Sequence, residues 1–153
     1  LQDETGGFRY STTPPQVSVG LTAGCLATLH ASGVYDGKVV DAGYDYVFRE
    51  LAARAPRADG EPKGEPATFP YYERLYLAQA FWQHRDLQHF RRWAEDEVRV
   101  ILADQRTDGT WEDRRPSGRA GGLTRGRYGD AYATAMNCLF LSVPEGLLPI
   151  FRR

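Results

Sequence analysis

Residues 71–82, YYERLYLAQAFW, decide the fold, because apolar side chains occupy most faces of the helix that this stretch predicts. A helix that is hydrophobic nearly all round has to be buried on most sides. Residues 86–105 instead place their apolar side chains on one stripe and their charges opposite, as is typical of a helix that covers a core. A buried helix is therefore followed by a covering one.

The same order extends outward in both directions. Residues 18–31 predict an apolar helix that Gly33 stops, and residues 41–54 predict an amphipathic helix. Residues 130–142 predict a third buried helix, while the stretches 55–66 and 107–127 are rich in Gly, Pro or Arg and predict exposed loops. The sequence thus predicts an all-α protein of about five to six helices, in the order inner, outer, inner, outer, inner.

A short repeat supports this order. The segments Gly20-Leu-Thr-Ala, Tyr76-Leu-Ala-Gln and Tyr132-Ala-Thr-Ala align, and their starts at positions 20, 76 and 132 are evenly spaced. Each of the three lies in a predicted inner helix. The chain is therefore expected to consist of related units whose loops differ in length.

A second recurrent element joins a Gln to a Gly and an aromatic residue. We expect the Gln to bond free groups at the helix ends, the Gly to supply the turn, and the aromatic ring to stack over the Gln amide. The element would then be a structural staple between neighbouring helix pairs. Its residues are Gln2, Gly6 and Phe8 in one copy and Gln105, Gly109 and Trp111 in the other.

At these residues the sequence resembles the prenyltransferase and squalene-oxidase repeat of terpene cyclases and protein prenyltransferases. The likeness includes Tyr71-Tyr72, Trp93, Tyr132-Ala-Thr-Ala and the closing Leu147-Leu-Pro-Ile-Phe-Arg, and is closest to uncharacterised bacterial repeat proteins of that superfamily. The resemblance implies a partial α/α toroid over residues 1–153, with inner-helix ends facing a central cavity.

The catalytic patterns of the superfamily are missing from this chain. Asp41, Asp45 and Asp96 do not form the Asp-x-Asp-Asp cluster with which triterpene cyclases protonate their substrate. The acidic run at 95–97 does not match the magnesium-binding Asp-Asp-x-x-Asp. Cys25 and His30 lack an aspartate at the zinc spacing of protein prenyltransferases. We therefore expect no metal and no cofactor.

Polar and aromatic residues on the inner helices are the candidate cavity lining. Their aromatic faces could stabilise a cation or an apolar ligand. In the structural alternative, Glu73 pairs with an arginine, Asp130 caps its helix and the tyrosines pack. The candidates are Tyr72, Glu73, Tyr76, Tyr128, Asp130 and Tyr132.

Composition limits the partners. The chain of 153 residues has a formal net charge of −1, which argues against a nucleic-acid partner. No run reaches the roughly 18 consecutive apolar residues of a membrane span. The Arg-rich stretch 106–127 could bind a diphosphate or an acidic partner, although such loops are usually solvated.

Two hypotheses follow for function. The first is a non-catalytic binding or scaffold module, with an apolar or isoprenoid-like ligand; the second is part of a terpene-cyclase-like or prenyltransferase-like enzyme whose catalytic residues lie outside this chain. Leu1-Gln2 is similar to the end of the outer helix at Leu102–Gln105, so we expect a portion of a longer polypeptide. An open sector would expose its inner helices, and we expect self-association or an N-terminal half that covers them.

Overall fold

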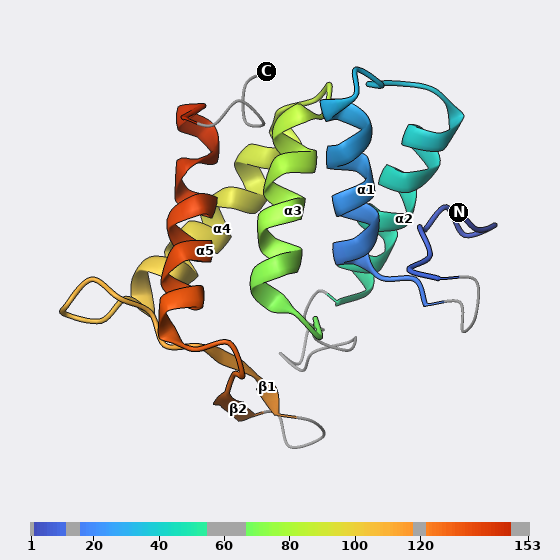
Figure 1. Ribbon diagram of the computed structural model, residues 1–153. Coiled ribbons are helices and arrows are strands. Elements are labelled where there is room, and N and C mark those ends of the chain that lie inside the picture. Colours follow the sequence, from blue (N-terminus) through green and yellow to red (C-terminus); the bar gives the residue numbers. More distant parts are fainter. Residues whose placement is uncertain (1, 12–15, 55–66, 118–121, 148–153) are drawn as a thin grey trace.

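The computed structural model describes residues 2–11, 16–54, 67–117 and 122–147 (Figure 1). Leu1, the predicted loop at 55–66 and the closing segment from residue 148 onward lie outside these ranges. The described part contains five α-helices and a 3-10 turn at Val143–Glu145, so the all-α prediction is confirmed. The helices are α1 (Val19–Ala31), α2 (Lys38–Arg54), α3 (Pro70–Gln83), α4 (Gln88–Ala103) and α5 (Asp130–Ser142).

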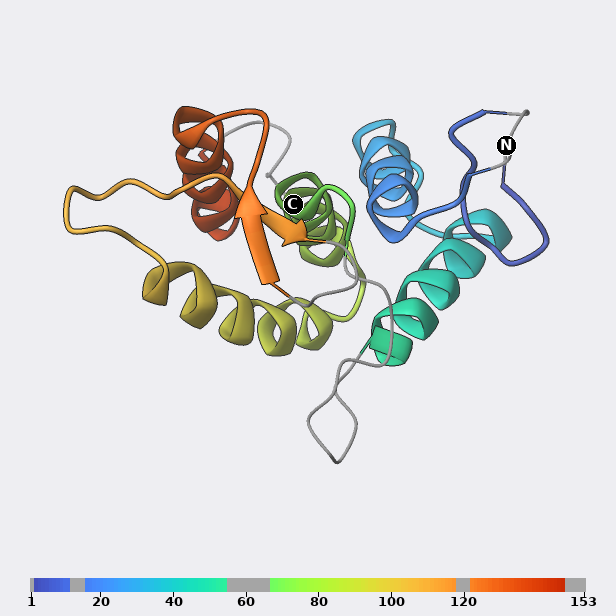
Figure 2. The same cartoon turned by 90° about the horizontal axis from the view of Figure 1, so that it is seen from below.

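The helices lie in two layers. Seen from below in Figure 2, α5, α3 and α1 form one row, and α4 and α2 lie on one side of it, which is the rear in Figure 1. Helix α3 is central, because it packs against α1, α4 and α5. The three helices of the front row run in one direction and the two behind run in the other (Figure 1). A toroid built from such layers stays a prediction.

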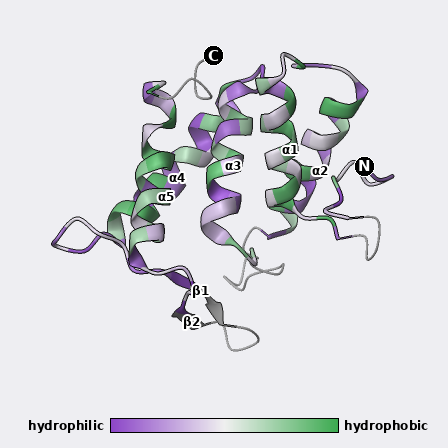
Figure 3. Cartoon of the chain, in the orientation of Figure 1, coloured by the Kyte–Doolittle hydropathy of each residue, from purple (hydrophilic) through white to green (hydrophobic). Residues whose placement is uncertain are grey.

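The core lies between the layers. Phe81 of α3 is 2% exposed, and its ring meets Trp93 of α4 edge-on at a centroid distance of 5.4 Å. Trp93 in turn contacts Phe140 of α5 at 5.6 Å. Hydrophobic residues, green in Figure 3, are correspondingly concentrated in the helices. The three aromatic rings therefore join α3, α4 and α5 into one packed unit.

The loop prediction for 107–127 is wrong in part. Strands β1 (Arg114–Ser117) and β2 (Gly122–Arg125) pair antiparallel, with Arg114 opposite Arg125. The pairing satisfies backbone groups, but these strands lack the alternation of apolar and polar residues by which a strand is recognised in a sequence. Composition alone therefore indicated a loop.

The Gln/Gly/aromatic element has the same backbone geometry in both copies. Gln2 Nε2 donates to the carbonyl of Gly6 at 2.8 Å, and Gln105 Nε2 donates to that of Gly109 at 3.0 Å. Gly6 and Gly109 have φ angles of +89° and +83°, which favour glycine. The Gln amide thus closes its own loop, and Gln2 also donates to the carbonyl of Val39 in α2 at 2.8 Å.

The aromatic residue attaches each loop to the next front-row helix. The amide N–H of Phe8 donates to Thr22 Oγ1, and that of Trp111 donates to Thr134 Oγ1, both at 3.0 Å. These two threonines occupy the same place in the aligned segments at 20 and 132. The middle segment, which has no such loop before it, carries the buried Ala78 there. A hydroxyl is therefore present where a loop amide needs an acceptor.

In the second copy, the bond to the end of α4 is made by Trp111 and not by Gln105. The indole Nε1–H of Trp111 donates to the carbonyl of Ile101 in the last turn of α4 at 2.7 Å, and the Trp111 side chain is 4% exposed. Carbonyls in a last helical turn lack an intrahelical partner. The ring therefore caps α4 and fills the core at the same time.

Buried histidines lie at the opposite end of α3 from the hairpin. His30 of α1 and His84, just after α3, are 3% and 8% exposed, and both rings contact Tyr44 of α2. The Tyr44 hydroxyl donates to the carbonyl of Ala80 at 2.6 Å. Burial lowers the pKa of His30 and of His84, and each is lowered further by another histidine: His84 acts on His30, and His89 acts on His84. Both imidazoles are therefore packed in the neutral form.

These two histidines predict a loss of stability in weak acid. An unfolded histidine titrates near pH 6.5. Because the folded pKa values lie lower, the unfolded chain binds protons first as the pH falls below about 6.5, and the free energy of unfolding decreases. Urea unfolding at pH 7.5 and pH 5.5 should show this decrease, and His30→Leu should reduce it. Equal unfolding free energies at the two pH values would contradict the prediction.

Candidate functional site

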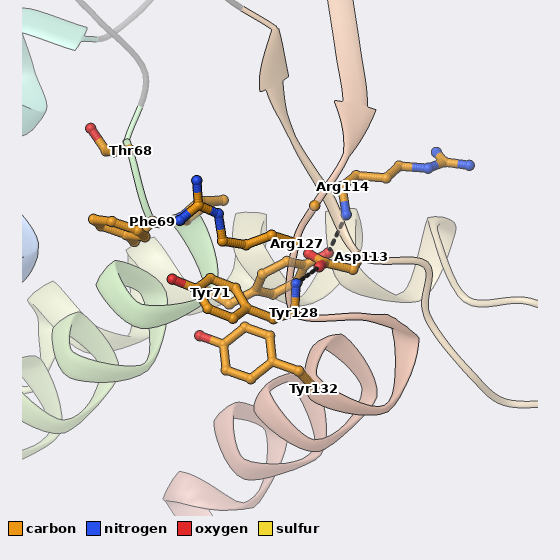
Figure 4. A pocket seen from close by; sticks show the side chains of 10 residues that line it. Thr68, Phe69, Tyr71, Asp113, Arg114, Arg127, Tyr128 and Tyr132 are labelled. Atoms are coloured by element: carbon orange, nitrogen blue, oxygen red, sulfur yellow. Dashed lines mark hydrogen bonds between the residues drawn. The ribbon is translucent and has the colours of Figure 1, made fainter.

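A cleft of about 150 Å³ lies where α3 and α5 begin, beside the hairpin (Figure 4). Its walls come from three segments that are distant in sequence: the start of α3, the residues around β1, and the turn between β2 and α5. Two of its lining residues, Tyr128 and Tyr132, were candidates from the sequence. The lining residues are Thr68, Phe69, Pro70, Tyr71, Asp113, Arg114, Gly126, Arg127, Tyr128 and Tyr132.

Asp113 fixes the turn that forms one wall. It is 2% exposed, and its Oδ2 accepts the backbone N–H groups of Tyr128 and Gly129, both at 2.8 Å. Its carbonyl accepts the N–H of Gly126 at 2.7 Å. A β-carbon at Gly126 would lie only 2.0 Å from Asp113 Oδ1, so any other residue there would displace the carboxylate. The carboxylate therefore serves the backbone and is not presented to the cleft as a free acid.

Asp130 supports the same loop and does not line the cleft. Its Oδ1 accepts the N–H of Asp113 at 3.0 Å, and its Oδ2 accepts from Arg106 at 2.8 Å. The hydrogen bond from the Asp113 backbone, followed by that from Arg106, lowers the pKa of Asp130. The N-cap position itself is occupied by Gly129. The ionised Asp130, at the start of α5, is thus bonded both to Arg106 in the loop after α4 and to Asp113 just before β1.

Tyrosine rings form the apolar part of the cleft. The ring of Tyr132 lies 5.0 Å from that of Tyr128 and stands nearly perpendicular to that of Tyr71 at 5.9 Å. The Tyr71 hydroxyl donates to the carbonyl of Glu112 at 2.9 Å and accepts the N–H of Arg114 at 3.2 Å. Burial raises the pKa of Tyr71 and of Tyr132, so both hydroxyls are neutral at physiological pH.

Two arginines supply the positive charge at the cleft. Arg114 bonds Glu112 Oε2 through Nε at 3.1 Å and through Nη2 at 2.9 Å. Arg127 is exposed, and no ion pair joins it to an acidic side chain in the part of the chain that the structure describes. Arg127 is therefore the cation that a bound molecule can reach without breaking an existing pair.

The remaining candidates lie elsewhere, at the contact between α1 and α3. The rings of Tyr72 and Tyr76 are 4.5 Å apart, and a β-carbon at Gly24 of α1 would lie 3.2 Å from the Tyr72 hydroxyl. Glu73 forms an ion pair with Arg54, as in the structural alternative. The structure therefore does not gather the six candidates at one place.

Sequence reasoning missed several residues of the cleft. Phe69, Asp113 and Arg127 were not candidates: Asp113 and Arg127 lie in the stretch 107–127 that was assigned to a loop, and Phe69 lies between the predicted loop at 55–66 and the predicted helix at 71–82. Asp113 did carry a usable signal, since it follows Trp111 by two residues and the staple had to bring this segment into the core. Tyr71 was passed over in favour of its neighbour Tyr72, because helical periodicity does not decide between adjacent positions of an all-round apolar helix.

Metal binding finds no support in the described residues. Within the ranges described above, no group of three or more His, Cys, Asp or Glu side chains is arranged to hold a metal ion. No helix there has the length and hydropathy needed to cross a membrane.

The cleft offers aromatic faces, hydroxyl groups and a guanidinium group, and these chemical groups suit ligand binding.

No family model matches the chain, and no similar curated protein or solved structure is found.

Proposed function

We propose that this chain is a non-catalytic binding module of the prenyltransferase/squalene-oxidase repeat type, and that the aromatic cleft takes an apolar or isoprenoid-like ligand. Support for the repeat type comes from the two layers and from the recurrence of the staple on Thr22 and Thr134. Support for binding comes from one observation above all. Phe69, Tyr71, Tyr128 and Tyr132 converge on one cleft from separate segments.

The disposition of the acidic groups favours binding over catalysis. A general acid needs a carboxyl that can reach the substrate and release a proton. Asp113 is bound to two backbone amides, and Asp130 is bound to a backbone amide and Arg106. The alternative, an enzyme whose catalytic residues lie outside the chain, and the expected self-association both stay predictions.

A ligand titration tests the proposed function. We expect farnesyl diphosphate or squalene to raise the melting temperature saturably without forming a product. Tyr128→Ala should weaken this binding about tenfold, because a stacked aromatic contact is lost while the backbone N–H that holds Asp113 remains. Tyr10→Ala is the matched control, since Tyr10 is 80% exposed and does not line the cleft.

Three outcomes would contradict the proposed function. If neither ligand raised the melting temperature, the proposal of an isoprenoid-like ligand would be wrong. Equal effects of Tyr128→Ala and Tyr10→Ala would place the ligand outside the cleft. Product formation by the isolated chain would show catalysis.

A further inference from the structure

A second cavity, of about 260 Å³, lies at the other end of α3, between α2 and the turn that leads into α4. It shares no lining residue with the aromatic cleft. Four of its lining residues carry rings and four carry charged groups. They are Tyr44, Phe48, His84 and His89, and Asp41, Asp45, Arg85 and Asp86.

The rings form a continuous wall. Tyr44 lies against His84 with ring centroids 4.4 Å apart, and Phe48 lies against His89 at 4.3 Å. Tyr44 and Phe48 are stacked at 5.9 Å, which joins the two pairs. Burial lowers the pKa of His84, so near neutral pH this imidazole adds a ring and not a positive charge. Aromatic faces attract cations through their quadrupole.

The charges around this wall are mainly negative. Asp41 is paired with the largely exposed Arg85 at 3.6 Å, and Asp86 lies 3.7 Å from the imidazole of His89. Asp45 is exposed and has no ion pair among the residues that the structure describes. One carboxylate at the rim is therefore available to a positively charged ligand.

We infer that this ring-walled cavity binds an organic ammonium ion, with the rings of Tyr44, Phe48 and His89 around its alkyl groups and the carboxylate of Asp45 near its charge. A quaternary ammonium suits aromatic walls, because it has no N–H that must be matched by acceptors. The described residues contain no group of three ligands for a metal ion, which makes an organic cation the better occupant.

Choline and its neutral isostere 3,3-dimethyl-1-butanol provide the test, because they share a shape and differ in charge. Titration of the whole chain, followed by the ring resonances of His84 and His89, should give saturable shifts with choline. The neutral alcohol should bind about tenfold more weakly or not at all. Equal shifts with both compounds, or no shift with choline, would overturn the inference.

A pair of charge variants adds a control on fold. Asp45→Asn should weaken choline binding several-fold to about tenfold, because the rim loses the carboxylate near the ammonium. Asp96→Asn makes the same change on α4, where the side chain is 80% exposed, and should leave the affinity unchanged. Equal effects of the two variants would also overturn the inference. A peptide that carries trimethyl-lysine shows whether the ammonium group belongs to a protein or to a small molecule. Tighter binding of the peptide than of choline identifies a protein side chain, and equal binding identifies a small quaternary ammonium compound.

Discussion

Trp111→Ala is expected to lower the free energy of unfolding by about 3–5 kcal/mol, the range found for large aromatic residues truncated in a core. The indole is 4% exposed and its Nε1–H caps the carbonyl of Ile101. Its removal leaves a cavity beneath the loop and an unsatisfied carbonyl at the end of α4. Urea unfolding followed by circular dichroism measures the change.

Two further variants separate the contributions of this residue. Trp111→Phe retains most of the apolar ring but loses the hydrogen bond to Ile101, so the loss should be about 0.5–1.5 kcal/mol beyond the change in volume. Tyr10→Ala removes an aromatic ring that is 80% exposed and should change stability by less than about 0.5 kcal/mol. If Trp111→Ala were as mild as Tyr10→Ala, the staple would not be structural.

Asp113→Ala should destabilise the protein and abolish ligand binding in the aromatic cleft. The substitution leaves the part-buried N–H groups of Tyr128 and Gly129 without their acceptor, and a hydrogen bond to a charged group contributes about 1.5–3 kcal/mol. The turn that carries Arg127 and Tyr128 would then lose its position beside Tyr71 and Tyr132. Unfolding and ligand titration should be measured on the same preparation.

Gly126→Ala should likewise destabilise the protein and abolish ligand binding, because it displaces the Asp113 carboxylate. Its methyl group would lie 2.0 Å from Asp113 Oδ1, so the carboxylate must move. Asp96→Ala, which removes an exposed carboxylate on α4, should change neither stability nor binding measurably. Normal binding by both Asp113→Ala and Gly126→Ala would show that the carboxylate does not organise the cleft.

The helices could be predicted from the sequence because hydrophobic periodicity is a local property. The predicted helix at 130–142 matches α5, and the stretch 71–82 lies within α3. The recurrent Thr of the aligned segments also had a physical cause, since Thr22 and Thr134 accept the amides of equivalent loops. Hydrophobic periodicity and the short repeat were therefore sufficient to predict the helices.

The cleft could not be predicted in the same way, because its residues meet only through tertiary contacts. Asp113 lies in a stretch rich in arginine and glycine, and its composition indicates a solvated acid, yet its side chain is 2% exposed and bonds the turn before α5. Glu73 lies on a predicted inner helix, but its partner Arg54 ends α2 on the far side of residues 55–66. No local pattern encodes such long-range pairs.

The most direct test of the proposed function locates the ligand on the protein. Intermolecular nuclear Overhauser effects should be recorded between bound farnesyl diphosphate and the tyrosine rings. We expect contacts to Tyr71, Tyr128 and Tyr132, and their disappearance in Asp113→Ala. Contacts to Tyr72 and Tyr76 in place of these three, or saturable binding without any contact to them, would contradict a binding site in the cleft.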